Sequence, residues 1–255
     1  MALAHRRGGG LGWYTRNTGS LRCSPDYDVH FGVNDLGLVN VYAKDIAYLP
    51  DWQQRIWAGY NVGPDGGVCE ELLASQVRAE PADTKAPEAY LGRGLSLLSE
   101  AAHASFGIQL LRPHGQTDEI LDHCHRFRAV DRAGLFALAK DMARLTADSI
   151  DSAAIHEFLE LEKKDRPGSL KSLERLVAQR IGDENARKLL GPLVGIYELR
   201  LADAHLPSSD VDDAIRLVGI DPTAPTVHQG FQLLDACVAS IHQIAQALKP
   251  PSSED

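Results

Sequence analysis

The sequence has few aromatic residues, few cysteines and no long apolar run. Phe, Trp and Tyr make up 6% of the 255 residues, and the four cysteines show no Cys-x-x-Cys spacing. Neither a zinc ribbon nor a disulfide scaffold is indicated, and a reducing, cytoplasmic setting is expected. No apolar run reaches the roughly 18 residues that a membrane-spanning helix needs, so we expect no membrane partner.

Positive charge is also scarce, because 26 Lys and Arg stand against 35 Asp and Glu, a net charge of −9. A role in coating DNA is not expected, since phosphate backbones attract positive surfaces. The deficit is uneven: residues 126–188 carry thirteen Lys and Arg against eleven Asp and Glu, whereas residues 198–255 carry three against nine. Arg126, Arg128 and Arg132 predict an RNA-contacting strip if they face a common groove; otherwise they belong to ordinary solvated helix faces.

The N-terminal third combines a flexible start with short strands. Residues 1–25 are rich in Gly, Arg and Ser, which predicts a flexible lead-in. Alternating apolar residues at 29–33 and an apolar run at 38–42 flank Asn34-Asp35-Leu36-Gly37, and this pattern predicts two strands joined by a turn. We expect a small α+β region of short strands and helices over residues 26–112.

The rest of the chain has helical character. A helix is expected over 69–78, an exposed connector over 79–88 and a second helix over 89–106. The clearest helical stripe is the last one, which consists of Val227, Phe231, Leu234, Val238, Ile241, Ala245 and Leu248. The sequence therefore predicts a mainly α protein with a C-terminal antiparallel helical bundle over 118–248 and a tail at 249–255.

Metal-binding side chains cluster in Asp122-His123-Cys124-His125. On a helix, His123 and His125 lie about 200° apart, whereas a zinc site places helical ligands at i, i+3 or i+4. No second cluster supplies further ligands, and the sequence lacks nucleotide-binding and hydrolase motifs. We therefore predict no metal and no cofactor.

The strongest chemical signal lies in the segment from Gly191 to Pro207. Pro192 suits the first turn of a helix, and Pro207 predicts that the helix ends near His205. The expected buried stripe consists of Leu193, Tyr197, Leu201 and Ala204. Arg200 lies about 50° from the centre of this stripe, so its stem lies against the core and its guanidinium needs a partner or a cleft.

A guanidinium and an imidazole at this position suit attack on a phosphodiester. His205 can take or deliver a proton at a ribose 2′-hydroxyl, and Arg200 can hold the charge that develops on the phosphorane oxygens. The structural alternative is that Arg200 pairs with Asp203 three residues later, while His205 contacts the last carbonyl groups of the helix.

Arg, four residues and His near the end of a helix in an all-α bundle resemble the HEPN superfamily, whose active members carry Arg-x4–6-His as metal-independent ribonucleases. The resemblance implies that Arg200 and His205 are the catalytic pair, and that two protomers bring their motifs together across a homodimer interface. Asp203 and Glu198 are the supporting candidates beside them. The chain departs from the commonest form of the motif, because Leu201 stands where a polar residue usually follows the arginine. The preceding β-containing region is similar to sensing parts of some prokaryotic defence proteins.

Two functions are therefore expected. The first is a metal-independent endoribonuclease that binds RNA as a homodimer, in phage defence or as a toxin. The second is a non-catalytic helical dimerisation or interaction module with a degenerate HEPN-like fold, indicated by the apolar seam from Val227 to Leu248. In the first, Arg200 and His205 lie exposed at a dimer cleft, whereas in the second they are satisfied within one subunit.

Overall fold

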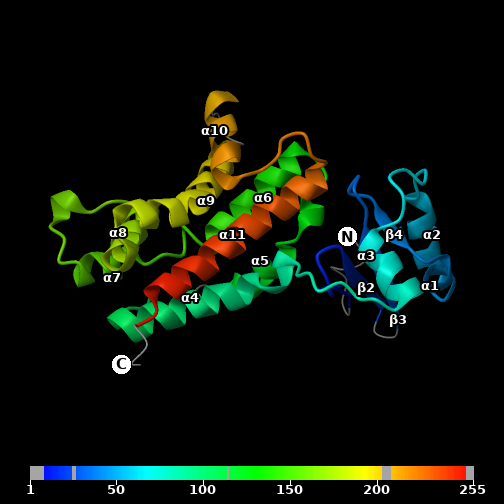
Figure 1. Cartoon of the computed structure of the whole chain (residues 1–255), viewed down its shortest axis with the longest axis horizontal. Helices are drawn as coiled ribbons and strands as arrows, with labels where there is room; N and C mark the ends of the chain where they lie inside the picture. The colour runs from blue at the N-terminus through cyan, green and yellow to red at the C-terminus, as the bar shows by residue number, and fades with distance from the viewer. Residues whose placement is uncertain (1–8, 25–26, 114, 203–207, 251–255) are drawn as a thin grey trace. The chain divides into compact units, whose positions relative to one another are not determined.

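The computed structural model describes residues 9–24, 27–113, 115–202 and 208–250. The chain forms two compact units, residues 1–89 and residues 90–255 (Figure 1). The first, called here the N-terminal unit, contains the β-sheet and short helices, and the second, the helical unit, contains the long helices. The protein is thus mainly α-helical with a small β region, as the sequence predicts.

The N-terminal unit contains a four-stranded antiparallel sheet in the order β1-β2-β3-β4. Its strands are β1 (Gly10–Trp13), β2 (Thr18–Ser24), β3 (Tyr27–Val33) and β4 (Val39–Val41). The predicted hairpin is confirmed, because β3 and β4 pair with Phe31 opposite Val41. The Asn34 side chain closes the turn between them by accepting the backbone N–H groups of Leu36 and Leu38 at 3.1 and 2.9 Å.

The flexible lead-in predicted for residues 1–25 is wrong for residues 10–24, which form β1 and β2. These strands pair through main-chain hydrogen bonds, which do not depend on apolar side chains. At Gly19 a Cβ atom would stand 2.7 Å from the ring of Phe31. The glycine that suggests flexibility in the sequence therefore allows close packing of neighbouring strands instead.

Short helices complete this unit: α1 (Ala43–Ala47), α2 (Asp51–Gly59), α3 (Glu70–Leu73), the π-helix η1 (Ala74–Arg78) and the 3-10 helix η2 (Pro87–Ala89). The predicted helix over 69–78 is present as α3 and η1. Its Glu71 carboxylate accepts hydrogen bonds from Thr15 Oγ1 at 2.6 Å, from the Asn17 backbone at 2.9 Å and from Thr84 Oγ1 at 2.9 Å. This carboxylate joins the helix to the β1–β2 turn and to the connector.

The helical unit contains α4 (Leu91–Phe106), α5 (Thr117–His123), the 3-10 helix η3 (Arg126–Arg128), α6 (Arg132–Leu145), α7 (Ser152–Phe158), the 3-10 helix η4 (Lys163–Asp165), α8 (Ser169–Ile181), α9 (Asp183–Ala202), α10 (Ser208–Val218) and α11 (Thr226–Leu248). The unit begins with α4, so the division lies after residue 89 and not between the predicted regions 26–112 and 118–248. The reason is that Leu91, Leu95 and Leu98 of α4 are buried in the helical core. In the described part of the chain, no helix is both long and apolar enough to cross a bilayer.

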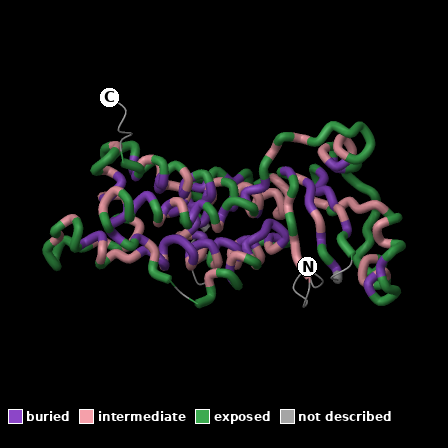
Figure 2. Tube along the Cα trace, turned by 90° about the horizontal axis from the view of Figure 1, so that it is seen from below, coloured by how far each residue is buried: buried purple, intermediate pink, exposed green. Residues whose placement is uncertain are grey.

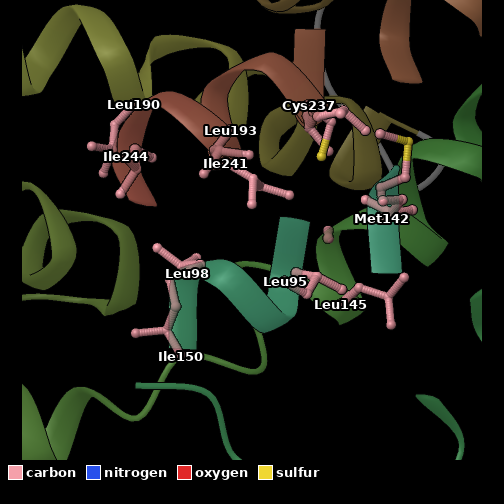
Figure 3. Packing of buried hydrophobic residues seen from close by; sticks show 14 of the residues in the cluster. Leu95, Leu98, Met142, Leu145, Ile150, Leu190, Leu193, Cys237, Ile241 and Ile244 are labelled. Atoms are coloured by element: carbon pink, nitrogen blue, oxygen red, sulfur yellow. The ribbon is translucent and has the colours of Figure 1, made fainter. Parts of the chain in front are cut away.

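The helix α11 packs against both α4 and α9. It runs antiparallel to α9, because Leu190 lies beside Ile244 and Leu193 beside Ile241 (Figure 3). By contrast α4 runs parallel to α11 (Figure 1). Ser105 near the end of α4 donates to the main-chain oxygen of Leu248, the last residue of α11. A parallel helix from the preceding segment thus joins the predicted bundle.

The apolar seam predicted on α11 is part of the intramolecular core. Its members Leu234, Val238, Ile241, Ala245 and Leu248 are all buried. Buried residues lie on the inward sides of the long helices (Figure 2). The helix α11 packs chiefly against α4, α9 and η3 of its own unit, and also against α6, so the buried part of the seam contacts helices of the same chain.

The helix α9 begins at Asp183 and not at Pro192, which lies inside it. Gly191 tolerates the following proline because it has no Cβ to clash with the ring. The buried apolar side chains of α9 are those of Ala186, Leu190, Leu193, Ile196 and Leu199. The predicted stripe is therefore wrong at Tyr197, which is half-buried, and at Leu201, which is 41% exposed.

Candidate functional site

Arg200 lies in the last described turn of α9, next to the buried Leu199. Its side chain is 27% exposed, and its guanidinium carbon lies 5.0 Å from the centre of the Tyr197 ring. The side chain therefore lies at the edge of the core and is partly exposed to solvent, as the sequence predicts for this residue.

The carboxylate that pairs with Arg200 belongs to Asp148. Nη1 of Arg200 donates to both carboxylate oxygens, and the Asp148 side chain is 37% exposed. The two residues are 52 positions apart in the sequence, and they meet because α6, which precedes Asp148, packs against α9. A search for helical i+3 or i+4 partners cannot find this pair, because the partner lies on another element.

Three other predicted positions, Asp203, Ala204 and His205, lie outside the described residues. The catalytic pair of Arg200 and His205, and the expected contact between Arg200 and Asp203, therefore stay predictions.

Glu198, the other supporting candidate, belongs to an acidic neighbourhood. Burial, followed by the negative charges of Asp210 and Asp213 on α10, raises the pKa of the Glu198 carboxyl group. These carboxylates disfavour a phosphate near Glu198. The carboxylate that binds Arg200 is Asp148, which follows α6 and does not belong to this acidic neighbourhood.

The segment that carries Asp148 is anchored on the end of α6. The Asp148 backbone donates to the main-chain oxygen of Ala143 at 2.9 Å, and Thr146 Oγ1 donates to that of Met142 at 2.8 Å. Ser149 Oγ donates to the main-chain oxygen of Arg144 at 2.5 Å. These bonds to the last turns of α6 hold the main chain of the segment that carries Asp148.

Two more arginines line a groove beside this segment. Nη2 of Arg112 donates to the main-chain oxygen of Asp148 at 2.6 Å, and Nη2 of Arg144 donates to Oε1 of Gln116 at 2.6 Å. A groove of about 410 Å³ between them is lined by Arg112, Pro113, Gln116, Arg144, Asp148 and Ser149. Sequence reasoning missed Arg112 and Arg144, since neither belongs to a recognisable motif.

The predicted strip of Arg126, Arg128 and Arg132 does not form as expected. Arg126 is fully buried, with its guanidinium carbon 4.5 Å from the centre of the Phe231 ring, so it cannot contact RNA. Its burial follows from the packing of η3 against α11. Arg128 is 36% exposed and pairs with Asp141 at 3.3 Å, while Arg132 is exposed.

The His123 to His125 cluster is divided between surface and interior. His123 is half-buried, with Nδ1 2.6 Å from the main-chain oxygen of Glu119, whereas Cys124 and His125 are buried. Burial also raises the pKa of the Cys124 thiol. Within the described ranges, no group of three His, Cys, Asp or Glu side chains could hold a metal ion.

No family model matches the chain, and no curated protein or solved structure matches it either. The resemblance to HEPN proteins therefore stays a prediction that depends on Arg200 and His205.

Proposed function

We propose that the helical unit is a metal-independent endoribonuclease in which Arg200 and His205 act on the scissile phosphodiester. The observation that supports this proposal is the partly exposed side chain of Arg200, whose guanidinium is paired with Asp148 at the edge of the bundle. Among the described residues, its hydrogen bonds use Nη1 alone. A guanidinium has five N–H donors, so those on Nη2 and Nε remain for phosphate oxygens.

The proposed reaction is an internal transesterification. His205 accepts the proton of the ribose 2′-hydroxyl, the 2′-oxygen bonds to phosphorus, and the bond from phosphorus to the 5′-oxygen breaks. The leaving 5′-oxygen takes up a proton from a second imidazole or from water. Arg200 stabilises the negative charge on the non-bridging oxygens in the transition state, and Asp148 is a positioning residue that fixes the guanidinium.

The test is cleavage of several RNAs by purified protein in the presence of EDTA, with infected-cell extract added in a parallel series. We expect Arg200→Ala and His205→Ala to abolish cleavage. Asp148→Asn should lower kcat about tenfold, or about 1.4 kcal/mol in the barrier, with little change in KM. Arg216→Ala is the matched control, because Arg216 is an exposed arginine that pairs with Asp213 on α10. RNA left intact by the wild-type protein in every series would contradict the proposal.

The second candidate is a non-catalytic helical interaction module. Its support is the Arg200–Asp148 ion pair, which is complete within one subunit. In that case Asp148→Asn and Arg200→Ala would lower the melting temperature by similar amounts, and neither RNA cleavage nor RNA binding would be detected. Light scattering and pull-down experiments would then have to show a dimer or a protein partner.

A further inference from the structure

The groove beside Asp148 is formed by two segments that pair with each other. Leu111 and Ile150 form an antiparallel β-bridge, and the Arg112 backbone donates to the main-chain oxygen of Ser149 at 2.8 Å. The Asp151 backbone donates in turn to the main-chain oxygen of another residue, Leu110, at 2.8 Å. These main-chain hydrogen bonds place the backbone of Arg112 at the wall of the groove. Its side chain therefore extends from a paired backbone segment and not from a flexible loop.

The two guanidiniums in the groove are oriented by neutral acceptors. Arg112 donates to a main-chain carbonyl group, and Arg144 donates to the amide oxygen of Gln116. Neither bond neutralises the charge of the arginine. With its amide oxygen facing Arg144, Gln116 has its NH₂ group as a further donor for an anion in the groove.

The charge balance around these arginines is positive. Arg144 and Arg128 share one carboxylate, Asp141, with N–O distances of 3.7 and 3.3 Å. With Arg112 and the Arg200–Asp148 pair included, this neighbourhood holds four positive charges against two negative ones, Asp141 and Asp148. The hollows that adjoin the groove are lined in part by Glu100, Asp118 and Glu119, which repel phosphate. A phosphate is therefore favoured at the groove itself.

We infer that this groove is a phosphate-binding subsite for RNA, in which Arg112 and Arg144 hold a phosphate next to the scissile one. The inference rests on the proposed function, because it takes Arg200 as the site of cleavage. Asp148 connects the two places: its main-chain oxygen accepts from Arg112, and its carboxylate accepts from Arg200. A short single strand can then place consecutive phosphates at the groove and at Arg200.

The test measures binding of a short fluorescein-labelled single-stranded RNA by anisotropy, using full-length protein that carries His205→Ala so that the RNA stays intact. Arg112→Ala and Arg144→Ala should each weaken binding about tenfold and reduce the slope of log K against log salt by about one. Arg216→Ala should bind like the parent. Gln116→Glu serves as a second variant, because it adds a negative charge at an exposed position without removing a guanidinium. It should weaken binding as well, and thermal unfolding verifies that each variant is folded.

The outcomes separate this inference from the proposed function. Unchanged RNA affinity in Arg112→Ala, Arg144→Ala and Gln116→Glu would overturn the subsite, even if cleavage by otherwise wild-type protein still required Arg200. Loss of affinity in these variants without any cleavage by the wild type would retain the subsite and overturn the ribonuclease. In a competition arm, inorganic phosphate and unlabelled RNA are compared at equal phosphate concentration for their ability to displace the labelled RNA. Equal displacement would show a site for the free anion and would overturn the assignment to RNA.

Discussion

Replacing Gly230 by alanine tests the packing that buries Arg126. Gly230 is a buried residue of α11, and an added Cβ would stand 2.7 Å from the Cβ of Ala129 and 3.0 Å from the main-chain oxygen of Arg126. Carbon atoms in contact normally lie about 3.5–4.0 Å apart, so this contact is too short by about 1 Å. Overpacking of this kind costs about 1–3 kcal/mol.

Helix propensity opposes this cost, because alanine in place of a helical glycine gains about 1 kcal/mol. Steric overlap should prevail, since the atoms it meets belong to a backbone turn and a side chain without rotamers. We expect a net loss of about 1–2 kcal/mol, measured by urea unfolding followed by far-ultraviolet circular dichroism. Gly92→Ala is the control: its Cβ would meet only the Leu121 side chain at 3.4 Å, so it should be neutral or stabilising. Equal free energies of unfolding for Gly230→Ala and Gly92→Ala would contradict the close packing of α11 on the turn that contains Arg126.

Three further changes test other parts of the molecule. Glu71→Ala should destabilise the N-terminal unit by about 2–3 kcal/mol, because three donors lose a carboxylate acceptor; tryptophan fluorescence in urea reports this, since Trp13, Trp52 and Trp57 all lie in that unit. Burial raises the pKa of the Cys237 thiol from 9.0 to about 12. Because the folded state disfavours the thiolate, the stability that the buried thiol contributes is present below pH 9.0 and is lost as the pH rises toward 12. Cys237→Ala should therefore flatten the decline of the urea midpoint above pH 9.0, and an unchanged slope would contradict the burial of this thiol. Arg126→Ala should cost about 2–4 kcal/mol through lost packing and lost contact with an aromatic ring, and an unchanged melting temperature would contradict its interior position.

Some errors of the sequence predictions have a common physical cause. The sequence pattern predicts flexibility in the glycine-rich start and a first helical turn at Pro192. In the structure, Gly19 is required for close packing of two strands, and Pro192 lies inside a helix. The deciding contacts are tertiary: Gly19 packs against Phe31 of another strand, and the helical turns before Pro192 bury Ala186 and Leu190 in the core.

The local sequence was sufficient for the β3–β4 hairpin and for α11, but not for β1 and β2. The hairpin depends on the Asn34 turn, and the α11 seam depends on a regular apolar repeat, and both are short-range features that a linear pattern contains. The position of Arg200 at the edge of the core also follows from helical periodicity. Tertiary structure alone decided that Asp148 pairs with Arg200, that Arg112 and Arg144 share a groove, and which arginine is buried. These contacts join residues from different elements, in one case 52 positions apart, and helix packing brings them together.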